Sequence, residues 1–240
     1  MALISCKDLT MRYENQVAVD HVTFQIQEGD YLCIVGENGS GKSTLLKGLL
    51  GLLHPASGSI TYGDGLKRNM IGYLPQQTVV QKDFPASVWE VVLSGCLNRR
   101  GLRPFYSTGE RQRARENIAR MDIGAIVKSC YRDLSGGQQQ RLTIARALVG
   151  NPEILILDDC SSALDYATDA ALRKSLRRRA EHATVFMVSQ RVSTVRGCDR
   201  ILVMEDGEVV GSGTHAQLLE SCPTYQEICM SQMNAEEAGA

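Results

Sequence analysis

Long apolar runs are missing from this 240-residue chain, although hydrophobic residues make up 43% of it. No stretch approaches the roughly 18 apolar residues that a membrane-spanning helix needs. Near the start, Lys7, Asp8 and Arg12 interrupt the sequence too early for the apolar core of a signal peptide. We therefore expect a cytoplasmic protein that reaches a membrane only through a partner.

Paired cysteines and an excess of one charge are also missing. The eight cysteines are scattered without a C-x-x-C pair, which argues against both a disulfide framework and a zinc knuckle and favours a reducing compartment. The formal net charge is only −1, so there is no global electrostatic case for nucleic acid. Basic clusters at residues 99–103 and 173–179 have few aromatics beside them, which favours a solvated helix face and no nucleic-acid partner.

What the chain does contain is an alternation of short apolar runs with helical patterns, the mark of an α/β fold with a mainly parallel sheet. Strands are expected at residues 3–9, 22–26, 31–35, 71–74, 154–157, 184–188, 201–204 and 208–210. Hairpins are expected within residues 13–26 and at the D-G turn of residues 206–207. We expect one domain over residues 1–233, with a helical insertion at about 77–137 and a disordered tail at 234–240.

The spacing G-x-x-x-x-G-K-S lies between an apolar strand and a leucine-rich helix. This is the P-loop pattern, in which backbone N–H groups and a helix N-terminus surround phosphates, a lysine reaches the outer phosphates and a hydroxyl binds Mg²⁺. The residues expected to hold ATP here are Gly36, Glu37, Asn38, Gly39, Ser40, Gly41, Lys42, Ser43 and Thr44. Asp158, at the end of a buried run, is expected to hold Mg²⁺ together with Ser43.

The segment LSGGQQQR at residues 134–141, added to these two motifs, resembles the signature of ATP-binding cassettes, the nucleotide-binding subunits of ABC transporters. The resemblance runs from about Leu3 to Met230 and implies a P-loop NTPase fold of ABC type, with an antiparallel N-terminal β subdomain and a helical insertion. It implies that two cassettes, as a homodimer or heterodimer, stack head to tail and drive a transmembrane permease from the inner face of the cell membrane. It also implies that Ser135, Gly136, Gly137 and Gln138 close over the nucleotide of the partner cassette.

Further roles follow from the same resemblance. Tyr13 matches the aromatic residue that stacks on adenine, and Gln76 matches the glutamine that touches Mg²⁺ and signals to the permease. The alternatives are an ordinary exposed tyrosine and a solvated loop amide. Asp159 and Gln190 depart from the pattern, because active members carry a water-polarising glutamate and a γ-phosphate-sensing histidine there.

These two departures predict tight ATP binding with slow hydrolysis. The carboxylate of Asp159 falls roughly 1.5 Å short of the position that glutamate reaches, and misplacement by about 1 Å can cost ~10²-fold in rate. Gln190 lacks the positive charge available to histidine. The alternatives are that Asp159 works well enough alone, or that the chain is an essentially non-hydrolytic binding module. A DNA-maintenance or translation ATPase is disfavoured, because the chain shows neither a long coiled coil nor a second cassette.

The chain also resembles two branches of the family. Residues 51–60 and 79–95 are similar to zinc and manganese importers, whereas residues from about 142 onward are similar to the degenerate cassette of heterodimeric exporters. Natural recombination, a deliberate chimera or a faulty gene prediction would each give such a mosaic. Importer-like Phe84, Val88, Trp89 and Val92 are expected to favour a metal-uptake permease as partner. A partly exposed Trp89 would suit a binding hot spot, and a place in the core of the insertion is the alternative.

Overall fold

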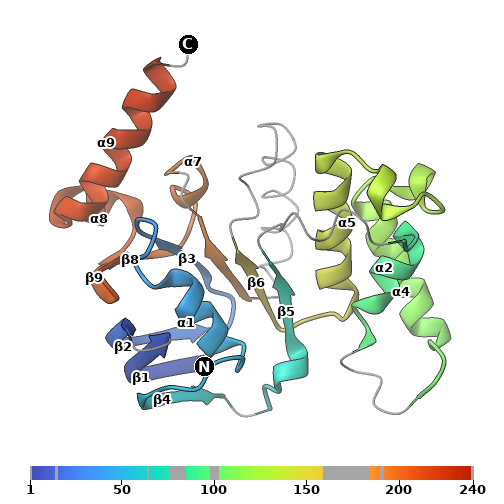
Figure 1. Ribbon diagram of the computed structural model, residues 1–240, viewed down its shortest axis with the longest axis horizontal. Helices are drawn as coiled ribbons and strands as arrows, with labels where there is room; N and C mark the ends of the chain where they lie inside the picture. Colours follow the sequence, from blue (N-terminus) through green and yellow to red (C-terminus); the bar gives the residue numbers. More distant parts are fainter. Residues whose placement is uncertain are drawn as a thin grey trace. The chain divides into compact units, whose positions relative to one another are not determined.

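The computed structural model describes residues 2–13, 16–63, 65–75, 85–97, 103–158, 184–189 and 192–238. It divides into two compact units, one formed by residues 1–68 and 179–240 and the other by residues 69–178. Figure 1 shows the elements of each. The expected fold, a P-loop α/β core with an added antiparallel sheet and a helical insertion, is confirmed in its elements.

The first unit contains two sheets. An antiparallel sheet has the strand order β2-β1-β4, formed by β1 (Ala2–Tyr13), β2 (Gln16–Gln27) and β4 (Ser57–Tyr62). In the other, β3 (Tyr31–Val35) pairs in parallel with β7 (Thr184–Val188) and with β8 (Arg200–Glu205), and β9 (Glu208–Gly213) pairs antiparallel with β8. Every residue of β3 and β7 is buried, as expected for central parallel strands.

The hairpin expected at the D-G turn is present, whereas residues 16–27, within the range of the other expected hairpin, form a single strand of a longer hairpin with residues 2–13. Strands β1 and β2 pair antiparallel up to Tyr13 and Gln16, and β8 and β9 join through Asp206 and Gly207. These two turn residues have φ angles of 46° and 89°, which fits the D-G turns that join twisted hairpin strands. Strand β4 was not expected from the sequence, because its SGSITY segment is mostly exposed and lacks an apolar run.

The described residues of the first unit also form helices α1 (Lys42–Leu49), α7 (Val192–Val195), α8 (His215–Ser221) and α9 (Pro223–Ala238). The buried side of α1 carries Leu45, Leu46 and Leu49. Helix α9 continues to Ala238, into the segment that was expected to be a disordered tail from residue 234. Alanine and glutamate dominate that segment, and both have high helix propensity.

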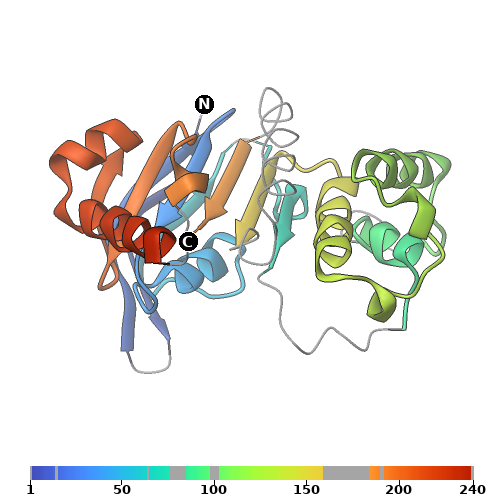
Figure 2. The same ribbon diagram turned by 90° about the horizontal axis from the view of Figure 1, so that it is seen from above.

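The second unit combines two parallel strands with a cluster of helices. Strands β5 (Ile71–Leu74) and β6 (Ile154–Asp158) pair in register, with Tyr73 opposite Ile156. Helices α2 (Val88–Ser94), α4 (Thr108–Arg120) and α5 (Gly136–Val149) pack together, as Figure 2 shows. Short 3₁₀ turns occupy Arg68–Met70, Gly124–Ile126 and Tyr131–Asp133.

Serine starts each of these three helices by the same device. Ser87, Ser107 and Ser135 each accept a hydrogen bond from a backbone N–H three residues later. The side-chain oxygen of the Glu or Gln at that position accepts one from the serine N–H. This capping box satisfies two backbone groups that a helix N-terminus leaves without partners.

Candidate nucleotide-binding site

The P-loop connects the end of β3 to the start of α1, as the sequence predicted. Its glycines adopt backbone conformations that other residues rarely take, with φ of 92° at Gly39 and 94° at Gly41. Gly41 is the residue before α1, and no side chain caps the helix there. The N–H groups of the first turn are therefore available to an anion, as is the partial positive charge of the helix end.

Two of these glycines are also enclosed by backbone. A Cβ at Gly36 would collide with the carbonyl oxygen of Met204 in β8, and a Cβ at Gly41 would collide with the carbonyl oxygen of Ala18 in β2. Gly39 differs, because a Cβ there would meet no atom within 4 Å. Strands β2 and β8 thus hold the two ends of the loop, while its middle at Glu37, Asn38 and Gly39 is exposed.

This contrast predicts unequal effects of alanine at two glycines with almost equal φ. Gly39→Ala is expected to lower the free energy of unfolding by about 1–2 kcal/mol, the strain of a left-handed residue with a Cβ. Gly41→Ala adds the collision with Ala18, for which overpacking values indicate about 1–3 kcal/mol more. Urea denaturation of both variants measures the difference, and equal destabilisation would contradict this account of the loop.

The side chain of Lys42 lies along the loop. Its Nζ donates to the carbonyl oxygen of Gly36 at 2.9 Å, to Ser40 Oγ at 3.1 Å, and also to the carbonyl oxygen of Glu37. The residue is only 7% exposed. A buried ammonium group is thus held by neutral acceptors at the mouth of a helix N-terminus, where a phosphate would supply the opposite charge. The following Ser43 is exposed and Thr44 is half-buried.

Tyr13 ends β1 with its side chain 51% exposed, so the ring has a free area for stacking. The sequence did not single out its neighbour Lys47, whose Nζ lies 4.8 Å from the centre of the Tyr13 ring. A cation–π contact of this kind contributes about 0.5–1 kcal/mol at an exposed site. The last turn of α1 therefore steadies the tyrosine that the family resemblance assigns to adenine.

Asp158 is the last residue of β6, and its carboxylate accepts a hydrogen bond that the sequence did not reveal. The phenol of Tyr73 donates to Asp158 Oδ2 at 3.3 Å, and Asp158 is only 9% exposed. Burial, with the nearby Asp158 carboxylate, raises the pKa of Tyr73 to about 12. The phenol therefore remains a proton donor at neutral pH.

The signature segment forms the N-terminus of α5. Ser135 Oγ accepts from the N–H of Gln138 at 3.4 Å, and Gln138 Oε1 accepts from the N–H of Ser135 at 2.9 Å. A Cβ at Gly136 or Gly137 would meet nothing within 4 Å, so the first turn of the helix has an open surface. This geometry allows an anion to approach the backbone N–H groups of the helix start.

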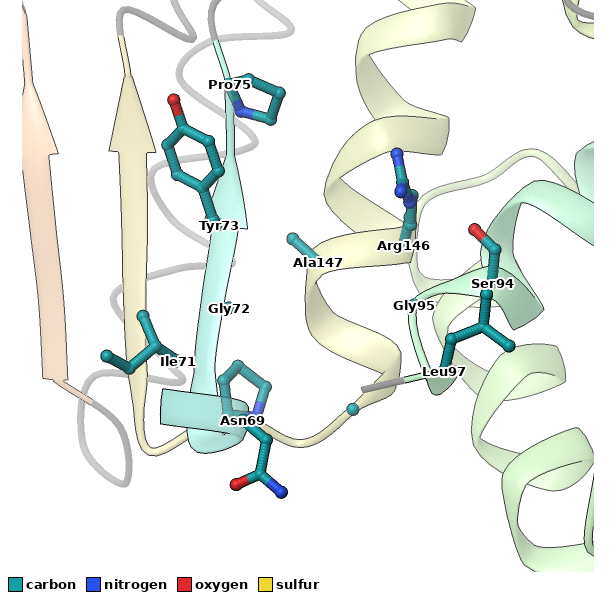
Figure 3. A pocket seen from close by; sticks show the side chains of 12 residues that line it. Asn69, Ile71, Gly72, Tyr73, Pro75, Ser94, Gly95, Leu97, Arg146 and Ala147 are labelled. Carbon is teal, nitrogen blue, oxygen red and sulfur yellow. The ribbon is translucent and has the colours of Figure 1, made fainter. Parts of the chain in front are cut away.

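A cavity of about 410 Å³ lies within the second unit, between β5 and the end of α5 (Figure 3). Its lining includes the small residues Gly72, Gly95, Ala147 and Gly150. Polar side chains among the lining residues include Asn69, Ser94 and Arg146. The volume falls in the range of small-molecule or side-chain sites.

Three of the expected functional residues, Gln76, Asp159 and Gln190, lie outside the described residues, as does Phe84. Two of the importer-like residues, Val88 and Val92, are fully buried within the helical cluster. They occupy the inward side of α2, where the four-residue spacing places both on one face. Trp89 is half-buried, and the guanidinium of Arg115 lies 5.8 Å from the centre of its ring.

Comparison with known families gives a match to the ABC transporter model over residues 19–162. The zinc transport system ATP-binding protein TroB of Treponema pallidum is 38% identical, over 88% of this chain and 83% of its own length. A probable metal transport system ATP-binding protein of Chlamydia trachomatis is 33% identical, over 93% and 86%. The probable multidrug resistance ATP-binding/permease protein YheI of Bacillus subtilis is 37% identical over 91% of this chain, which spans 39% of that protein.

Solved structures agree on the fold. A bacterial Atm1-family ABC exporter with ATP bound has a TM-score of 0.82 and 27% identity, covering 95% of this chain and 42% of the exporter chain. A dimeric bacterial ABC transporter cassette has a TM-score of 0.75 and 30% identity, covering 88% of this chain and 98% of its own. Within the described residues, no helix is both long and apolar enough to span a bilayer.

Proposed function

The chain belongs to the ABC transporter family as an ATP-binding cassette, and on this premise we propose that it is the energy-coupling subunit of a transporter. Mg-ATP binds at the interface of a head-to-tail cassette dimer, and closure of that dimer drives a permease. The observation that carries the proposal is the P-loop itself, in which the buried Lys42 ammonium and an uncapped helix N-terminus face the same loop.

Each residue of the loop has a distinct task in this proposal. Backbone N–H groups of residues 36–44 bind the phosphate oxygens. The ammonium group of Lys42 leaves the carbonyl oxygens of the loop and donates to the outer phosphates. Tyr13, steadied by Lys47, stacks on the base. Ser135, Gly136, Gly137 and Gln138 serve the nucleotide held by the second cassette.

The metal in this proposal is Mg²⁺, which supplies charge neutralisation on the triphosphate when bound. Ser43, Gln76 and Asp158 are the residues assigned to it. The donors fit, because Mg²⁺ takes oxygen ligands, needs only one or two carboxylates and retains several waters. The exposed hydroxyl of Ser43 and the carboxylate of Asp158 are ligands of this kind.

Hydrolysis in this pocket is proposed to be slow. Asp159 and Gln190 would have to polarise the attacking water and stabilise the γ-phosphate, and each is weaker at this task than the glutamate or histidine that it replaces. The second candidate is therefore a nucleotide-gated module in which ATP holds the dimer closed with little turnover. The two substitutions in the sequence are the observation in its favour.

Calorimetry with Mg-ATP tests the common part of both candidates. The purified chain is expected to release or absorb a measurable heat when it binds Mg-ATP. If well-folded protein gave no binding heat, the proposal would be overturned. Turnover then separates the candidates, because ordinary transporter rates of roughly 1 s⁻¹ or above in the isolated chain would contradict slow hydrolysis.

For the partner, we propose a metal-uptake permease at the inner face of the cell membrane, with the cassette on the cytoplasmic side. The support comes from the relatives named as metal and zinc transport ATP-binding proteins, which match this chain over most of their length. Co-purification with a candidate metal-uptake permease, and metal uptake that requires both proteins, tests this part.

Ser135→Ala is expected to weaken ATP-dependent cassette dimerisation without weakening ATP binding to the same chain. Loss of the cap lowers the free energy of unfolding by about 1 kcal/mol, and Ser107→Ala, which breaks the same kind of capping box on α4, provides the matched control. Light scattering with and without ATP measures the dimer. If both serine variants impaired dimerisation equally, the effect would be structural and the role of Ser135 would be lost.

A further inference from the structure

The polar contact at the end of β6 points to a residue outside the motifs. Tyr73 lies on β5, opposite Ile156 of β6 in a parallel pair. Side chains two residues apart on a strand share a face, so Ile156 and Asp158 lie on the same side of β6. The phenol of Tyr73 extends along that side to Asp158, and Figure 3 shows its oxygen pointing past β5 toward the end of β6.

Both partners of this contact are held by packing. All five residues of β6 are buried. The neighbouring Gly72 has so little space that a Cβ would come within 2.8 Å of the carbonyl oxygen of Ala147 and of a ring carbon of Pro152. Strand β5 is thus pressed against the chain at the end of α5. The tyrosine is therefore fixed at its backbone and can place its hydroxyl at one carboxylate oxygen.

We propose that Tyr73 is a positioning residue for the metal-binding carboxylate of Asp158. Its hydroxyl donates to Oδ2 and thereby fixes the rotation of the carboxylate. The inference rests on the proposed function, since it assigns the orientation of a group whose ligand is Mg²⁺. It does not make Tyr73 a ligand, because the phenol contacts the carboxylate and not the metal.

Second-shell partners of this type commonly change metal affinity by 10- to 100-fold when they are removed. Tyr73→Phe deletes only the hydroxyl, and we expect the Kd for ATP measured with Mg²⁺ to rise about 10-fold. The Kd for ATP measured in EDTA is expected to stay within about twofold of the parent, because the phosphates and base do not depend on Asp158. The ratio of the two Kd values therefore reports the contribution of the metal.

Tyr62→Phe is the matched control. Tyr62 also donates its phenol within the fold, to the carbonyl oxygen of Leu49 at 3.0 Å, but has no assigned role. It is expected to leave both Kd values unchanged. An unchanged ratio in Tyr73→Phe, or an equal loss with and without metal, would overturn the positioning role.

A double-mutant cycle gives an independent measurement. In an Asp158→Asn background the metal contribution is already lost, so adding Tyr73→Phe is expected to change the ratio no further. A full additional effect in that background would also overturn the inference. If the parent chain itself bound no ATP with or without Mg²⁺, the proposed function would fail instead, and the two failures are distinguishable.

Discussion

Replacing Lys42 with alanine is expected to weaken ATP binding by about 100-fold or more. Hydrogen bonds from charged groups contribute about 1.5–3 kcal/mol each, so losing two bonds to phosphate oxygens corresponds to ~10²–10⁴ in Kd. The structure adds a reason, because Lys42 is buried beside the loop and its ammonium group already lies against the carbonyl oxygens of Gly36 and Glu37. Calorimetry with Mg-ATP measures the loss.

Lys67→Ala is the control, because Lys67 is an exposed lysine of the same unit. It is expected to bind ATP as the parent does. The Lys42 variant loses the hydrogen bonds to the carbonyl oxygens of Gly36 and Glu37, and thermal unfolding checks that it remains folded. A loss of about 1 kcal/mol would lower Tm by only a few degrees. Binding within tenfold of the parent would refute the role of Lys42.

Restoring the family's residues is expected to accelerate hydrolysis on the order of 10²-fold. Asp159→Glu returns a carboxylate to the reach of the attacking water, and Gln190→His returns a side chain that can carry positive charge. Positioned bases typically contribute ~10²–10⁴-fold, and misplacement by about 1 Å can cost ~10²-fold. Steady-state phosphate release by the double variant, compared with the parent at saturating Mg-ATP, measures the gain.

The single variants and ATP affinity provide the control for this experiment. Asp159→Glu alone should give most of the gain, because a histidine cannot act on a water that no base has activated. The Kd for ATP should change little, since neither residue is assigned to binding the phosphates in the ground state. No gain from the double variant would mean that closure of the cassette dimer, rather than the chemistry of this pocket, limits turnover.

The central strands were predicted well from the sequence, but strand β4, at one edge of the antiparallel sheet, was missed. Runs such as residues 31–35 and 184–188 are buried on both faces, so their apolar content is visible without any knowledge of the fold. Strand β4 is mostly exposed and pairs with β1. Its structure depends on a neighbour about fifty residues away, as the pairing of Ile4 with Tyr62 shows, and local pattern carries little of that information.

The candidate site divides in a similar way. The P-loop and the capping box of Ser135 were predictable because each is a local pattern in which glycine, serine or lysine has a fixed backbone task. The contact between Tyr73 and Asp158 joins residues separated by 85 positions. Only the pairing of β5 with β6 brings them together. The burial of Val88 and Val92 could not be predicted, because the family resemblance located the helix without giving its orientation.

The crowding around the P-loop bears on how its motif persists in evolution. Gly36 lies against the main chain of β8 and Gly41 against that of β2, so a side chain at either position would disturb one of the two sheets, with or without bound nucleotide. A descendant that had abandoned ATP would still be under selection to keep both glycines. Lys42 supports the loop only through hydrogen bonds of its side chain, so its replacement causes no collision with a sheet and would be the earlier record of lost activity.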